Sequence, residues 1–226
     1  MSTKRSYEDG CATAHGLDLV GERWALLVVR ELVLGPKRFT DLRSGLPGIS
    51  PNVLTMRLEE LERGSVLRRR KLPPPAAAWV YELTAWGMEL ESVIVALGRW
   101  SVRSPTLMQG HPLSTDGLIL SFRAMFDSPS AADFDAHLEL RLAEDSFFVD
   151  IARGRMKIAR GNAVKPDTVI ESDPQTLAGL AYGGVKFADA LRSGELRVSG
   201  DKAIARRFLG LFPLPEPAPA TAAVAN

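Results

Sequence analysis

The chain of 226 residues contains a single cysteine, Cys11. One cysteine cannot form an internal disulfide, so the fold has to rest on a packed core. A hydrophobic content of 46% is enough for such a core. A chain without a disulfide framework is typical of the reducing cytoplasm, and we expect the protein to be cytoplasmic.

Long apolar runs are also missing. No stretch approaches the roughly 18 apolar residues that a membrane-spanning helix needs. The first residues, MSTKRSYEDGC, lack the apolar core of a signal peptide, so we expect no membrane partner. Neither sign of charge dominates, because 28 basic and 27 acidic residues leave a net charge of +1. A polyanionic partner would therefore have to be met by a local basic patch.

Signatures of catalysis and of metal binding are absent from the sequence. The histidines at positions 15, 111 and 137 are far apart, and no pair has the H-x-x-x-H spacing of a metal site. We find no G-x-S-x-G motif, P-loop or dinucleotide fingerprint. The carboxylates are interspersed with basic residues, as on a solvated surface. The sequence therefore predicts no enzyme, no metal site and no cofactor.

The two halves of the chain differ in charge and in pattern. Residues 1–111 hold 15 basic and 12 acidic residues, whereas residues 112–226 hold 13 and 15. The first half is mostly helix-periodic, while alternating stretches such as HLELRL and FFVDI predict strands in the second. The Pro- and Gly-containing segment RSPTLMQGHPL separates them. We predict an α+β fold with domains at residues 1–109 and 110–213, followed by a disordered Pro/Ala-rich tail at 214–226.

Three helices are predicted between residues 17 and 63. Apolar residues recur at helical spacing through LDLVGERWALLVVRELVLG, and RFTDLRSGL predicts a short second helix. After the turn PGIS, Ser50 suits an N-cap and Pro51 the first position of a third helix. That helix would place three leucines inward, Leu54, Leu58 and Leu61. A short helix, a tight turn and a following helix are typical of a helix-turn-helix.

The outward face of the third helix changes character along its length. We expect it to comprise Asn52, Thr55, Met56, Arg57, Glu59 and Glu60. The first turns of a recognition helix enter the major groove and the later turns leave it. Asn52, Thr55 and Arg57 come early enough to meet base edges or phosphates, whereas the glutamates come late. The alternative is an amphipathic three-helix bundle with a solvated polar face.

A basic hairpin follows the third helix. In GSVLRRRKLPPPAAAWVYELT, two strand-like runs flank a Pro/Ala loop, and Arg68 to Lys71 open the first run. Residues 37–71 hold nine basic and four acidic residues, a local net charge of +5. A basic hairpin after a recognition helix is a wing, although a merely solvated hairpin is the alternative. The predicted DNA contacts are Lys37, Arg38, Thr40, Arg43, Ser50, Asn52, Thr55, Arg57, Arg68, Arg69, Arg70 and Lys71.

These segments resemble a known family. GERWALLVVREL, RFTDLRSGLPGISPNVLTMRLEELERGSVLRRR and YELTAWGMEL are similar to HxlR-type winged-helix transcription regulators across roughly residues 11–101. The resemblance implies a homodimer that binds a palindromic operator in double-stranded DNA. A later helix would help to form the dimer face through Leu90, Val93, Ile94, Leu97 and Trp100, although spacing alone equally predicts a core stripe. The wing tip PPPAAAW departs from relatives that carry a charge there, which puts a minor-groove contact in doubt.

The same resemblance draws attention to Cys11 as a possible redox site. Some members of the family sense oxidants through a cysteine near this position. His15 follows by one helical turn, and a protonated imidazole there would lower the pKa of the thiol. The alternative is an unreactive, partly buried cysteine.

The second half resembles another family. The segment from Asp167 to Phe212 is similar to the C-terminal part of sterol-carrier-protein type 2 domains, with Asp173, Pro174 and Asp201 suited to helix starts. We expect a curved antiparallel sheet covered by helices. The resemblance implies an apolar cavity for lipids or other hydrophobic molecules. Candidate wall residues are Phe122, Met125, Phe126, Leu177, Leu180 and Phe187, and the alternative for each is ordinary core.

Together these features predict a transcription regulator, most simply a repressor, whose operator affinity changes when an apolar small molecule binds the second domain. A rival function from another class is a carrier of lipids or small molecules that uses its helical half only to dimerise. Salt-dependent binding to DNA would separate the two.

Overall fold

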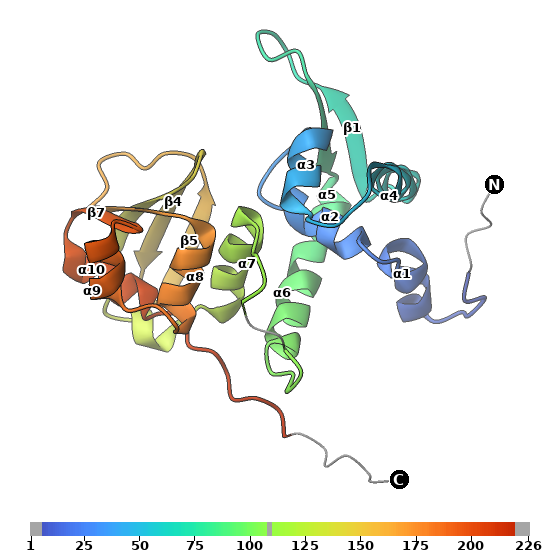
Figure 1. The fold of residues 1–226 in the computed structure, drawn as a ribbon. Coiled ribbons are helices and arrows are strands. Elements are labelled where there is room, and N and C mark those ends of the chain that lie inside the picture. Colours follow the sequence, from blue (N-terminus) through green and yellow to red (C-terminus); the bar gives the residue numbers. More distant parts are fainter. Residues whose placement is uncertain (1–5, 108–109, 220–226) are drawn as a thin grey trace. The chain divides into compact units, whose positions relative to one another are not determined.

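The computed structural model describes residues 6–107 and 110–219 (Figure 1). The chain packs as two compact units, Met1–Ile94 and Val95–Asn226. Within the described ranges, no helix is both long and apolar enough to span a bilayer.

The first unit is mostly helical. Its elements are α1 (Ala12–Val20), α2 (Ala25–Leu32), α3 (Phe39–Gly45), α4 (Pro51–Arg63), β1 (Leu67–Lys71), β2 (Trp79–Leu83) and α5 (Ala85–Met88), and α6 (Leu90–Ser101) starts in this unit and runs into the second. The predicted leucine stripe of α4 is buried at Leu54, Leu58 and Leu61, where it packs in a core shared with α2. The amphipathic spacing of α4 therefore places one face of the helix in the core.

Local side-chain chemistry sets the helix-turn-helix boundaries. The Ser50 hydroxyl accepts a hydrogen bond from the Val53 backbone N–H at 3.3 Å, and Pro51 occupies the first turn. The predicted start of the third helix is thus confirmed. In the turn before it, Gly48 has a φ of +90°, a conformation that favours glycine. The helix α3 starts similarly, since the Asp41 carboxylate accepts from the Arg38 N–H at 3.2 Å.

The predicted hairpin is also present. Strands β1 and β2 are antiparallel and run in register from Leu67 opposite Leu83 to Lys71 opposite Trp79. Lys37 extends this small sheet, because its backbone exchanges two hydrogen bonds with Tyr81, at 3.0 and 2.8 Å. The loop between the strands projects away from the helices of the first unit (Figure 1).

The second unit combines a five-stranded sheet with helices. After α7 (Thr115–Met125) come a 3₁₀ turn η1 (Pro129–Ala131), β3 (Ala136–Leu142), β4 (Asp145–Ala152), β5 (Arg155–Arg160), β6 (Thr168–Ser172), α8 (Pro174–Tyr182), α9 (Phe187–Ser193), β7 (Leu196–Gly200) and α10 (Lys202–Leu209). The strand order is β5-β4-β3-β6-β7. Neighbouring strands are antiparallel, as predicted, except that β3 and β6 are parallel.

One face of this sheet forms the core of the second unit. Alternation along β3 buries Leu138, Leu140 and Leu142, while α7 packs on β5 and α10 on β6 and β7. The helix starts predicted at Asp173 and Asp201 are confirmed. The Asp173 carboxylate accepts from the N–H groups of Gln175 and Thr176, and that of Asp201 from the N–H of Ala203.

The segment after α10 was predicted to be a disordered tail. Within it, residues 214–219 form neither helix nor strand. They are nevertheless bonded to the chain near Arg103, whose Nε donates to the Glu216 carbonyl at 3.0 Å and whose carbonyl accepts from the Ala218 N–H at 2.7 Å. The rest of the predicted tail, residues 220–226, lies outside the described residues.

Candidate nucleic-acid interface

The N-terminal half of α4 presents a short polar face. Asn52, Thr55 and Met56 are exposed and stand at positions i, i+3 and i+4, which share one side of a helix. An asparagine amide can pair with the edge of adenine, and a threonine can offer its hydroxyl or its methyl group to a base. The face therefore carries groups that can read bases. Residues 52–56 contain no carboxylate that would repel the phosphates.

Arg57 does not belong to this face, and our expectation that it points outward is wrong. Its side chain is buried, with 7% of the residue exposed. Nη1 pairs with the Glu60 carboxylate, and Nη2 lies 3.5 Å from Glu22 Oε2. The physical reason is helical geometry, since residue 57 follows Leu54 by three positions and adjoins Leu58. Arg57 instead links α4 to the segment before α2.

A buried carboxylate supports the residues that precede α3. Glu31 is fully buried in α2, where Oε1 accepts from Arg30 Nη2 at 2.9 Å and Oε2 from Lys37 Nζ at 2.6 Å. A buried charge needs such partners. A Cβ at Gly45 would lie 2.2 Å from Glu31 Oε2, so glycine leaves room for this group. The sequence analysis missed Glu31, although a single acid within the apolar run of α2 is a usable signal.

This arrangement changes the expected role of Lys37. Its ammonium group is committed to Glu31 and is partly buried, so it helps to hold α2 against the start of α3. Arg38, Thr40 and Arg43 are exposed, as a contact with DNA requires. Ser50 is exposed too, but its hydroxyl already caps α4.

Alternation along β1 separates the four basic residues of the wing. Arg68 Nη2 lies 2.6 Å from Glu82 Oε1, and Arg70 Nε lies 2.5 Å from Glu82 Oε2. Burial by itself would raise the pKa of the Glu82 carboxyl, but the hydrogen bonds and charges of Arg70 and Arg68 outweigh it and lower that pKa below its ordinary value. Two of the predicted cations therefore share one counter-charge on β2.

Arg69 is held differently. Its guanidinium lies 4.6 Å from the centroid of the Trp79 ring and 6.0 Å from that of Tyr81. Its backbone N–H donates to Glu62 Oε1 at 2.9 Å, which ties the wing to the end of α4. Lys71 is exposed one step further along the strand. We did not predict Trp79, although the diagonal spacing across the strand pair is the signal that would have found it.

Comparison with known proteins is consistent with these two parts. Residues 19–106 match the HxlR-like helix-turn-helix family, and residues 127–213 match the SCP-2 sterol transfer family. The HTH-type transcriptional regulator YodB of Bacillus subtilis is 36% identical over 83 residues, which are 37% of this chain and 74% of that relative. The chain belongs to the HxlR-like helix-turn-helix family. Both resemblances noted in the sequence are thereby confirmed.

The chain is also similar to other HTH-type transcriptional regulators. The B. subtilis regulator YdeP is 36% identical over 95 residues, 41% of this chain and 72% of that protein. A Synechocystis regulator is 38% identical over 87 residues, and the match spans just under two thirds of its length, 64%. The reduced form of YodB, a solved structure, aligns with 43% of this chain and 97% of its own at 31% identity, with a TM-score of 0.39. The protein is thus a transcription regulator of the HxlR type, with a C-terminal SCP-2 domain.

In the first unit, Cys11 is exposed rather than partly buried, and it stands at the N-cap of α1. Hydrogen bonds from the backbone of Thr13 and then of Ala14 lower the pKa of the thiol below its ordinary value. The pKa of the thiol is therefore lowered by the start of the helix. The sequence analysis had pointed to His15 instead.

In the second unit, the predicted ligand residues lie in or beside the core. Phe122 and Leu177 are fully buried and Met125 nearly so, while Phe126, Leu180 and Phe187 are partly exposed. The Phe122 ring stacks on Phe212 with centroids 4.3 Å apart, and Phe208 meets it edge-on at 5.8 Å. Packing of this kind is what a core requires, so Phe122 is a core residue in this structure.

Tyr182 packs beside the ring cluster formed by Phe122, Phe208 and Phe212. Its hydroxyl lies 2.6 Å from Ser121 Oγ, and burial raises the pKa of Tyr182 to about 12. The hydroxyl is therefore neutral at physiological pH and serves as a hydrogen-bonding group. Among residues 6–107 and 110–219, no group of three or more His, Cys, Asp or Glu side chains is placed to hold a metal ion.

Proposed function

We propose that this HxlR-type regulator binds double-stranded DNA through α4 and the β1–β2 wing. The observation that carries the proposal is a pair of neighbouring features. The exposed Asn52, Thr55 and Met56 face lies beside a wing whose Arg69 guanidinium has no carboxylate partner among the described residues. The strand of Arg69 is bonded to α4 through Glu62. A side-chain face that reads bases and a cation that meets phosphate are the two components of sequence-specific binding.

In this proposal, the first turns of α4 enter the major groove. Asn52 and Thr55 contact base edges, while Arg38, Arg43, Arg69 and Lys71 meet phosphates. Arg57 and Lys37 stay in their ion pairs and position α3 and α4 rather than touching DNA. Arg68 and Arg70 contribute less than their number implies, because Glu82 offsets their charge.

We further propose that the protein acts as a homodimer on a palindromic operator. The support is an apolar stripe on α6, where Val93, Leu97 and Trp100 are exposed and follow one another at intervals of four and three residues. Trp100 is 75% exposed, which is unusual for so large an apolar side chain without a partner. A two-fold dimer would place its two α4 helices in successive major grooves, roughly 34–36 Å apart.

Residues 1–109 would form the DNA-binding and dimerisation domain and residues 110–213 the sensing domain, and repression is the simplest mode of action. An apolar small molecule bound by the SCP-2 domain would then change operator affinity. Such a ligand can act only by binding two states of the dimer unequally. The ring cluster around Phe122 would have to rearrange to admit it, since those rings already pack on one another.

DNA binding is tested with fluorescence anisotropy on the segment upstream of the protein's own gene, across a series of salt concentrations. Wild type should bind with a steep salt dependence, and the double variant Asn52→Ala/Thr55→Ala should lose preference for that segment over unrelated DNA. Glu59→Gln is the control, because Glu59 is exposed later on α4. A wild type that shows no salt-dependent binding to DNA would instead favour the carrier function.

A further inference from the structure

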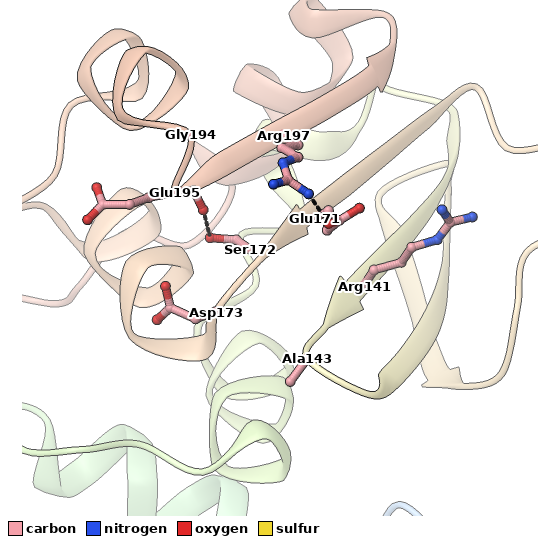
Figure 2. A pocket seen from close by; sticks show the side chains of 8 residues that line it. All are labelled: Arg141, Ala143, Glu171, Ser172, Asp173, Gly194, Glu195 and Arg197. Atoms are coloured by element: carbon pink, nitrogen blue, oxygen red, sulfur yellow. Dashed lines mark hydrogen bonds and ion pairs between the residues drawn. The ribbon is translucent and has the colours of Figure 1, made fainter.

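We propose that the start of α8 forms a two-part surface site for a small amphipathic amine. Two cavities meet at Asp173, which lines both. The first has a volume of about 510 Å³ and is lined by charged side chains (Figure 2). The second has a volume of about 330 Å³ and is lined largely by Pro112, Leu113 and Pro174. Both are open to solvent, so a ligand can reach them without disturbing the ring cluster around Phe122.

The arginines of the first cavity are already neutralised. Arg197 Nη1 lies 2.9 Å from Glu171 Oε1, an ion pair drawn in Figure 2. Arg141 Nε lies 2.6 Å from Oε1 of Glu139, a carboxylate that is itself buried. An anionic ligand would have to compete with these carboxylates for the guanidinium groups. The arginines therefore make the cavity polar without making it positive.

Two further carboxylates remain. Asp173 Oδ1 accepts from the backbone N–H groups of Gln175 and Thr176, both at 2.9 Å, and Glu195 Oε2 accepts from Ser193 Oγ at 2.8 Å. In the described part of the chain, no Lys, Arg or His forms an ion pair with either of them. Figure 2 shows both on the same side of the cavity, away from Arg141. With the two arginine–glutamate pairs neutral, these carboxylates leave a local charge that favours a cation.

The second cavity adds an apolar surface within reach of the same charge. Pro112 and Leu113 lie just before α7, and Pro174 is the first residue of α8, directly after Asp173. An ammonium group beside Asp173 and Glu195 would leave an attached hydrocarbon body lying on Pro112, Leu113 and Pro174. The two volumes together are in the range of small-molecule sites. Neither a fully apolar molecule nor an anion would use both halves.

This site goes beyond the proposed function, because binding of an amine here does not depend on DNA. The test uses the full-length, ¹⁵N-labelled protein without DNA and three probes of equal chain length, namely n-hexylamine, 1-hexanol and hexanoate. Hexylammonium should produce saturable NMR shifts at the backbone amides of Leu113, Gln175 and Glu195. Hexanol should bind more weakly, and hexanoate should not saturate these shifts.

Variants locate the site. Glu195→Gln should weaken hexylammonium binding roughly two- to fivefold, the range expected for one exposed charge pair, and should leave hexanol unchanged. Leu113→Ser should weaken both. Asp189→Asn, which removes an exposed α9 carboxylate outside the cavities, should change neither.

Three results would overturn the proposal. One is hexanoate binding as tightly as hexylammonium, which would make this an anion site. Another is hexylammonium binding that neither Glu195→Gln nor Leu113→Ser alters. The third is a lack of saturable shifts at these amides with any probe. If hexylammonium binds as expected but the protein does not bind operator DNA, the proposed regulator function is wrong and the amine site is still supported.

Discussion

The guanidinium of Arg69 lies 4.6 Å from the centroid of the Trp79 ring, across the two strands of the wing. An aromatic face attracts a cation without neutralising it, and it restricts the rotamers that a free arginine would sample. Arg69 is therefore both charged and partly ordered before DNA arrives. Its neighbours Arg68 and Arg70 share Glu82 as a counter-ion instead.

Arg69→Ala should therefore weaken binding to operator and to unrelated DNA alike, and should reduce the slope of log K against log salt by about one. Arg68→Ala is the matched control and should reduce that slope less, because its guanidinium already pairs with Glu82. Fluorescence anisotropy from low to physiological salt measures both. Equal effects of the two variants would show that the ion pair with Glu82 does not reduce the contribution of Arg68 to DNA binding.

Glu82 should make the stability of the first unit depend on pH. The folded-state pKa of its carboxyl lies below the ordinary value of 4.5. A lowered folded-state pKa means that the stabilisation is fully present above pH 4.5 and is lost as the pH falls below that value toward the folded pKa. The difference in melting temperature between wild type and Glu82→Gln should therefore shrink in acid. A difference that stays constant between pH 7 and pH 3 would contradict this account.

Arg57→Ala should reduce the free energy of unfolding by about 1–3 kcal/mol, because it leaves Glu60 without its buried partner and removes a link to Glu22. Asn52→Ala, an exposed change on the same helix, should stay within about 0.5 kcal/mol. Urea denaturation followed by circular dichroism measures both. If Arg57→Ala is as stable as wild type but loses sequence preference, Arg57 contacts DNA directly and our positioning role is wrong.

Cys11→Ser should bind operator within about twofold of wild type and should keep the response to the natural effector, since Cys11 lies outside the α4 and wing surfaces. The wild-type thiol should nonetheless react with iodoacetamide faster than free cysteine near neutral pH, because its pKa is lowered. An oxidant that releases wild type from DNA but not Cys11→Ser would make the thiol the main switch.

The sequence by itself determined the elements whose signals are local. Ser50 and Pro51 mark the start of α4, Asp173 and Pro174 that of α8, and alternating leucines mark β3, because caps, φ constraints and side-chain periodicity act within a few residues. The family resemblances also rested on such contiguous blocks. The basic wing was also visible in the sequence. Arg68 to Lys71 form a run of positive charge, and the Pro/Ala loop between the two strand-like segments cannot be helical.

Only the tertiary structure decided which side chains remain available for function. Periodicity led us to place Arg57 on the outward face of α4, and only its packing against Glu22 and Glu60 showed that it is buried. Glu82, from the opposite strand, separates Arg68 and Arg70 from Arg69. The cavities at Asp173 join Leu113 with Glu195, which are 82 positions apart in the sequence. Burial, ion pairing and cavities arise from contacts between distant segments, and a local pattern does not encode them.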